Sequence, residues 1–149
     1  MKSIFAALLF AFALPIAAQQ ARITEEIRSL KTYPFGDPND IPILVKDTRL
    51  YPYHTFEGYS HESEMQNWKV VKLENEFIEV YVLPEAGGKV WGAIEKATGQ
   101  EFIYRNEVMK FRNIALRGPW TSGGIEFNFG VIGHTPSTAS AVNYKLIEN

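Results

Sequence analysis

The chain has 149 residues, a length that suits one ordinary domain, and 13% of them are aromatic while 21% are charged. This is the composition of a globular protein, and a net charge of −2 with Lys and Arg scattered along the chain argues against nucleic-acid binding. The chain has no cysteine, so disulfides, cysteine-ligated metals and a lipid anchor on a processed cysteine are excluded.

The first residues have the pattern of a secretory signal peptide. Lys2 gives a positive start, an apolar run extends from Ile4 to Leu14, and Pro15 ends the run before small residues that suit cleavage after Ala18. The run is too short for a membrane anchor, which needs about 20 apolar residues. We therefore expect residues 1–18 to be removed and the mature chain to be periplasmic or extracellular.

Residues 19–67 are predicted to form an extended N-terminal lead-in. The pattern of residues 21–31 fits either a helix or an edge strand, and residues 41–47 fit a strand. Residues 51–64 form an aromatic and polar stretch that is typical of a loop. From residue 32 to residue 42, three prolines favour extended chain with turns: Pro34, Pro38 and Pro42.

A strand pattern is clear from residue 68 onward. Residues 68–74 and 77–84 alternate in polarity around a short turn, and residues 89–96 and 101–105 follow after further turn sequences. Residues 141–149 also have a strand pattern. Short strands at regular spacing are typical of an antiparallel sandwich or barrel, so we predict a mostly β protein.

Two stretches resemble a known family. They are "LENEFIEVYVLPEAGGKV" from Leu73, and "SGGIEFNFG" from Ser122 followed by "GHTPST". Together they are similar to the bacterial family DUF5107 of the galactose mutarotase-like superfamily. The resemblance implies an antiparallel β-sandwich over residues 68–149, an incomplete part of a supersandwich fold, and recognition or processing of carbohydrate. Family members are usually longer, so we expect an N-terminal portion whose partner is the missing C-terminal part of the architecture.

Glu126 is the strongest candidate for chemistry. It follows a Gly-Gly pair and is flanked by Ile125 and Phe127, so a flexible turn places a carboxyl group between apolar side chains. A carboxyl group in such a setting suits a general acid or base. The alternative interpretation is a structural carboxylate that pairs with Arg117 or Arg112, or that holds the glycine turn by accepting backbone N–H bonds.

The resemblance extends the candidate site beyond Glu126. His134 titrates near neutral pH and is the expected second catalytic residue, whereas Asn128, Trp120 and Arg117 are the expected substrate-binding residues. Asn128 offers both a donor and an acceptor to sugar hydroxyls, and Trp120 offers an apolar platform to a sugar ring. The structural alternatives are a turn histidine, a strand-end amide and a core aromatic residue.

No cofactor or metal ion is expected. Residues 54–64 contain two histidines and three glutamates, but their spacing matches neither a two-histidine helical motif nor an EF-hand. A solvated loop, or the rim of a sugar groove lined by nearby tyrosines, explains the segment better. The chain also lacks the G-x-S-x-G, phosphate-loop and dinucleotide-binding patterns.

The sequence therefore predicts a secreted or periplasmic carbohydrate-binding or carbohydrate-processing domain, part of a glycan-degrading enzyme that acts on oligosaccharides. Glycoside hydrolase or epimerase-like activity is implied by the resemblance, although hydrolysis normally uses two carboxylates and Glu126 has no close acidic neighbour in the sequence. The alternatives are a non-catalytic sugar-binding module and a truncated, inactive fragment. The expected partner is a carbohydrate ligand. Nucleic acid is not expected as a partner, and neither is a membrane after the signal peptide has been cleaved.

Overall fold

The four strands predicted between residues 68 and 105 are present in the computed structural model, which describes residues 21–35, 60–113, 119–127 and 139–147. In these ranges the chain forms β-strands and no α-helix, so the prediction of a mostly β protein is confirmed. The predicted signal peptide at residues 1–18 and the predicted strand at residues 41–47 lie outside the described residues.

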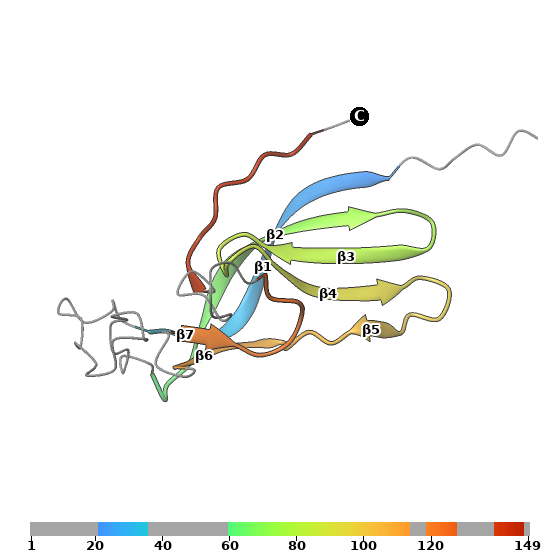
Figure 1. Ribbon diagram of the computed structural model, residues 1–149. Helices are drawn as coiled ribbons and strands as arrows, with labels where there is room; N and C mark the ends of the chain where they lie inside the picture. The colour runs from blue at the N-terminus through green and yellow to red at the C-terminus, as the bar shows by residue number, and fades with distance from the viewer. Residues whose placement is uncertain (1–20, 36–59, 114–118, 128–138, 148–149) are drawn as a thin grey trace, which may run out of the picture.

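Seven strands lie within the described ranges and are labelled in Figure 1. Each of the four strands predicted between residues 68 and 105 has its counterpart among β2 to β5. The bounds are β1 Arg22–Tyr33, β2 Glu64–Glu74, β3 Ile78–Leu83, β4 Lys89–Glu95, β5 Glu101–Ile103, β6 Val108–Asn113 and β7 Pro119–Thr121.

The strands form one sheet in the order β5-β4-β3-β2-β1-β6-β7. Five of the six strand pairs are antiparallel, but β1 and β6 run parallel, with Lys31 opposite Val108. The sheet is therefore mixed, with one parallel pair among mainly antiparallel strands, and a second layer of a sandwich stays a prediction. The boundary expected between residues 67 and 68 falls inside β2, which pairs along its length with β1.

The segment 21–31 is neither a helix nor an edge strand. It forms most of β1, which lies between β2 and β6. The prediction was wrong because an alternating pattern of polar and apolar residues reports one buried face, whereas the number of neighbouring strands depends on distant parts of the chain.

The core lies on one face of the sheet, which we call the inner face. Residues opposite one another in neighbouring strands share a face, and this rule groups Trp68 of β2 with Tyr81 and Leu83 of β3. On the other, outer face, Ile27 is 60% and Leu73 39% exposed. The buried cluster contains Trp68, Val70, Tyr81, Leu83, Ala86, Trp91, Met109 and Phe111.

Two turns fix the register of the central strands. Asn75 closes the β2–β3 hairpin because its side-chain Oδ1 accepts hydrogen bonds from the backbone N–H groups of Phe77 and Ile78, both at 2.9 Å. Between β3 and β4, Gly87 and Gly88 take φ angles of 70° and 67°, a left-handed conformation that suits glycine. The sequence predicted a turn at both of these places.

The C-terminal segment does not form the predicted strand. Residues 141–147 have no strand assignment, and the segment is held by separate backbone hydrogen bonds. The N–H of Gly87 donates to the carbonyl of Ser140 at 2.8 Å, and the N–H of Val142 donates to that of Pro84 at 2.9 Å. This segment therefore contacts the β3–β4 turn and does not pair with a strand.

Candidate functional site

The glycine turn after β7 brings the segment of Glu126 back against β4. The N–H of Gly124 donates to the carbonyl of Tyr104 at 2.7 Å, and Gly124 has a φ angle of 70°. A Cβ atom at this position would lie 2.1 Å from the carbonyl oxygen of Val90. Only glycine permits this approach, so "SGG" is a requirement of close backbone packing.

A β-bridge between Val90 and Ile125 follows the glycine turn. The N–H of Ile125 donates to the carbonyl of Val90 at 2.7 Å, and the reverse bond measures 3.1 Å. In antiparallel pairing the adjoining residues, Lys89 and Glu126, are the next cross-strand neighbours, with Cβ atoms typically about 4.5–5.5 Å apart. The bridge therefore places a lysine beside the candidate catalytic carboxylate.

Lys89 is buried at the inner face, with 2% of its surface exposed. Its Nζ donates a hydrogen bond to the backbone carbonyl of Thr121 at 2.9 Å. Burial lowers the pKa of Lys89 to about 8, and the negative charge of Glu126 opposes part of that decrease. The site thus contains an amine that changes charge within a pH unit or two of neutrality.

Two further polar groups lie at this junction. The hydroxyl of Thr121 is buried and has no hydrogen-bond partner among the residues that the structure describes. Asn106 connects the glycine turn to β4, because its side-chain Nδ2 donates to Oγ of Ser122 at 3.0 Å and its carbonyl accepts from Nε1 of Trp91 at 3.1 Å. These bonds fix the turn on both sides.

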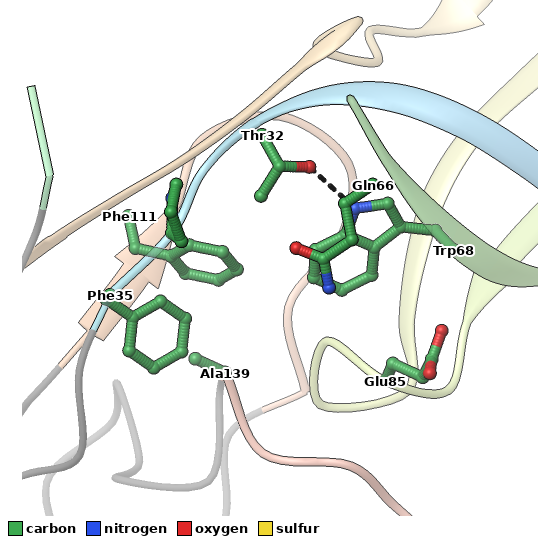
Figure 2. Close-up of a pocket in the computed structure, with 8 residues that line it drawn as sticks. Thr32, Phe35, Gln66, Trp68, Glu85, Phe111 and Ala139 are labelled. Carbon is green, nitrogen blue, oxygen red and sulfur yellow. Dashed lines mark hydrogen bonds between the residues drawn. The ribbon is translucent and has the colours of Figure 1, made fainter. Parts of the chain in front are cut away.

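A pocket of about 260 Å³ opens where β1, β2 and β6 meet (Figure 2). The rings of Phe35 and Phe111 have centroids 4.5 Å apart and form an apolar wall, and Nε1 of the buried Trp68 donates to the hydroxyl of Thr32 at 2.8 Å. Two exposed polar side chains and three smaller contacts complete the lining: Gln66, Glu85, Pro34, Thr32 and Ala139.

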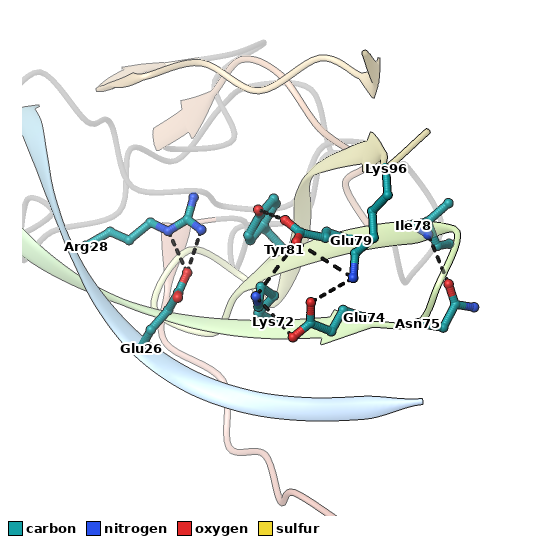
Figure 3. A network of polar contacts seen from close by, with 9 residues as sticks. All are labelled: Glu26, Arg28, Lys72, Glu74, Asn75, Ile78, Glu79, Tyr81 and Lys96. Atoms are coloured by element: carbon teal, nitrogen blue, oxygen red, sulfur yellow. Dashed lines mark hydrogen bonds and ion pairs between the residues drawn. The ribbon is translucent and has the colours of Figure 1, made fainter. Parts of the chain in front are cut away.

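A third group of polar residues covers the inner face of β1 to β4 (Figure 3). Nε of Arg28 donates to Glu26 at 2.6 Å, and its guanidinium group lies 4.1 Å from the ring centroid of Tyr81. Hydrogen bonds from Lys96 and Lys72 hold the pKa of Glu74 below its ordinary value. These cations are already paired with carboxylates, so the network is first of all a stabilising one.

The comparison with known families identifies the chain. The sequence pattern described as "Domain of unknown function (DUF5107)" matches residues 45–149, well over half of the chain. The chain belongs to the DUF5107 family. The DUF5107 match contains β2 to β7 and therefore both residues of the Val90–Ile125 bridge with the adjoining Lys89 and Glu126, whereas β1 lies before the match.

The DUF5107 chain is also similar to a solved structure. A TPR-domain containing protein from Parabacteroides distasonis ATCC 8503 superposes with a TM-score of 0.71 at 28% sequence identity. The match covers 85% of this chain and 22% of that protein, so this chain spans about a fifth of the length of the solved relative.

Only two of the five predicted site residues in this DUF5107 protein lie within the described ranges, Glu126 and Trp120. Glu126 lies beside Lys89, whereas Trp120 is opposite Arg112 on the face of β7 that is turned away from Phe111 and the inner face. The structure therefore does not bring Trp120 and Glu126 together. The other three predicted residues lie outside the described ranges: Arg117, Asn128 and His134.

Sequence reasoning missed Lys89 altogether. Lysine is rarely buried unless it is paired, so its residue type gives no indication of burial. The available signal was the strand alternation, which puts Lys89 on the same face as Trp91. Its partners Thr121 and Glu126 are distant in sequence, and local patterns do not reveal them.

The described residues contain neither a cluster of metal-ligating side chains nor a membrane-spanning helix. Within those ranges no group of three or more His, Asp or Glu side chains is placed to hold a metal ion. His54 and Glu57 of the histidine-rich loop lie outside them. Across the same part of the chain, no helix has the length and apolar character needed to cross a membrane.

Proposed function

We propose that this chain is the carbohydrate-binding part of an exported protein, and that a single sugar ring binds in the pocket of Figure 2. The observation that carries the proposal is the combination of an apolar aromatic wall with an amide and a carboxylate at one opening. Sugars present C–H faces and hydroxyl groups, which need these two kinds of partner.

The shape and chemistry of the pocket support a small polar ligand. Its volume of about 260 Å³ is below the roughly 300–1,000 Å³ of sites for drug-sized molecules, so it suits one ring rather than a long oligosaccharide. The amide of Gln66 supplies a donor and an acceptor, and the carboxylate of Glu85 is an acceptor that also receives the N–H of Lys69 at 2.7 Å. Phe35 provides the apolar side.

Binding of a panel of neutral and acidic mono- and oligosaccharides, followed by NMR or calorimetry, tests this proposal. Gln66→Ala should weaken binding of the preferred sugar at least about tenfold, the loss expected for a ligand hydrogen bond with a desolvated partner. Gln100→Ala is the matched control, since Gln100 is an exposed turn residue at a different end of the sheet. Equal binding by both variants would contradict the pocket assignment.

Acid–base processing of the sugar is the second candidate function, and the position of Glu126 favours it. A half-buried carboxylate beside a buried lysine is a pair of titratable groups of the kind that active sites use. His134 is proposed as the second catalytic residue, with Asn128 and Arg117 contacting the sugar. Glu126→Gln should abolish turnover of an oligosaccharide and leave the unfolding transition cooperative, whereas retained turnover would exclude this role.

Export is part of the proposal because residues 1–18 have the pattern of a signal peptide. Mass spectrometry of the chain expressed in a bacterial host should find a mature N-terminus at Gln19. A product that keeps residues 1–18 in the cytoplasm would contradict export without bearing on the sugar pocket.

A further inference from the structure

Lys89 occupies the point where three parts of the chain meet. It begins β4, its Nζ donates to the carbonyl of Thr121 at the end of β7, and it neighbours Glu126 across the Val90–Ile125 bridge. With 2% of its surface exposed, its ammonium group is shielded from water and depends on these protein partners.

The charges around Lys89 leave Glu126 as its electrostatic partner. From β7 the neighbouring polar groups are the carbonyl and hydroxyl of Thr121, and both are uncharged. Among the described residues, Glu126 is the charged group whose field acts on Lys89. Ion pairs with residues other than Lys89 are formed by eight further charged side chains: Glu26, Arg28, Lys72, Glu74, Glu79, Lys96, Glu101 and Arg105.

We propose that Lys89 is a positioning residue for Glu126, which it holds at the inner face by tying the end of β7 to the start of β4. The proposal rests on the acid–base role of Glu126 put forward above. Because Lys89 is shielded from solvent, its positive charge stays at a fixed position beside Glu126. The close approach of Gly124 to Val90 also holds the backbone that carries Glu126 against β4. The carboxylate is thereby pre-organised before any ligand arrives.

A double-mutant cycle on the full chain without ligand tests the coupling. Lys89→Met, Glu126→Gln and the double variant should show an interaction of at least about tenfold in the unfolding equilibrium constant. Lys72→Met is the matched control, because Lys72 is an inner-face lysine paired with Glu74 at 3.2 Å. Its effect should be additive with Glu126→Gln within about twofold, and additivity of Lys89→Met would overturn the proposal.

A second measurement keeps the proposal testable if Lys89→Met fails to fold. NMR titration of the Lys89 side chain should give a lower midpoint in Glu126→Gln than in the wild type, since the glutamate charge raises the pKa of Lys89. An unchanged midpoint would overturn the coupling.

Turnover provides the functional readout, which a purely structural lysine would not move. Between about pH 7 and pH 9 the rate should follow the titration of Lys89 in the wild type and in Lys72→Met, and this dependence should vanish in Lys89→Met. A pH profile that is unchanged in Lys89→Met would overturn the positioning role. Coupling without turnover of any glycan would instead reject the proposed processing function, so the two failures are distinguishable.

Discussion

Replacing Lys89 by methionine tests whether burial of an amine makes the stability of this protein depend on alkaline pH. The pKa of Lys89 falls from 10.5 to about 8 in the folded chain. Between these two values the unfolded state binds more protons than the folded state, so the free energy of unfolding must rise with pH. Below pH 8 the destabilisation is complete, and above 10.5 it is absent.

The size of the effect follows from the pKa values. A difference of one pKa unit corresponds to about 1.4 kcal/mol, so the full destabilisation by protonated Lys89 is about 3 kcal/mol. Roughly 2 kcal/mol of this is relieved between about pH 7 and pH 9.5, the range that avoids most titration of tyrosines and exposed lysines. Methionine has a similar length but does not titrate, so this dependence should be lost in Lys89→Met.

Urea unfolding of both proteins at several pH values is the direct assay. The difference in free energy of unfolding between Lys89→Met and the wild type should change by about 2 kcal/mol from pH 7 to pH 9.5, in the direction that favours the wild type at high pH. Other titrating groups are shared by the two proteins and cancel in the difference. A difference that stays constant within about 0.5 kcal/mol would refute the burial of a titrating amine.

Three further predictions concern single contacts. Gly124→Ala should lower the free energy of unfolding by at least about 3 kcal/mol, since it combines a left-handed φ with a steric overlap. Gly99→Ala also has a left-handed φ but open space around the new Cβ, so it should lower the free energy of unfolding by about 1 kcal/mol. Equal losses in urea unfolding would contradict this prediction. Trp68→Phe should cost about 1–3 kcal/mol because it leaves the buried hydroxyl of Thr32 without its donor, and a neutral result by thermal unfolding would argue against that bond. The pKa of Glu74 is lowered in the folded chain, so its stabilising contribution is present above the unfolded-state pKa of 4.5 and disappears as the pH falls through the folded-state pKa. Glu74→Gln should therefore reduce the loss of stability on acidification. A stability curve in acid like that of the wild type would contradict the prediction.

The central strands were predictable because their signals are local. The segments 68–74 and 77–84 show their alternation directly, and Asn75 marks the turn between them. The central position of β1 was not predictable in this way, because its pairing with β6 joins distant parts of the chain. The prediction of a strand at residues 141–149 was wrong for a related reason. An apolar pattern indicates that residues are buried, but it does not indicate which segment they pack against.

The candidate site was predicted only around its glycines. The Gly-Gly pair before Glu126 indicated a tight turn, and the structure shows the close approach to Val90 that makes Gly124 necessary. Lys89 could not be predicted, because its burial arises from a bridge between segments that are far apart in sequence. The roles of Asn128 and His134 stay predictions.

The strand order also constrains the sequence of folding events. β2 to β5 form an up-and-down series of hairpins, each of which can form as soon as its two strands exist. β1 is different, because Lys31 pairs with Val108 and four strands separate β1 from β6 along the chain. Closing so long a loop is slow, and until it closes one side of β1 exposes unpaired backbone groups. The edge of β1 therefore stays available for pairing with other chains until β6 has been synthesised, which exposes β1 to misassembly during folding.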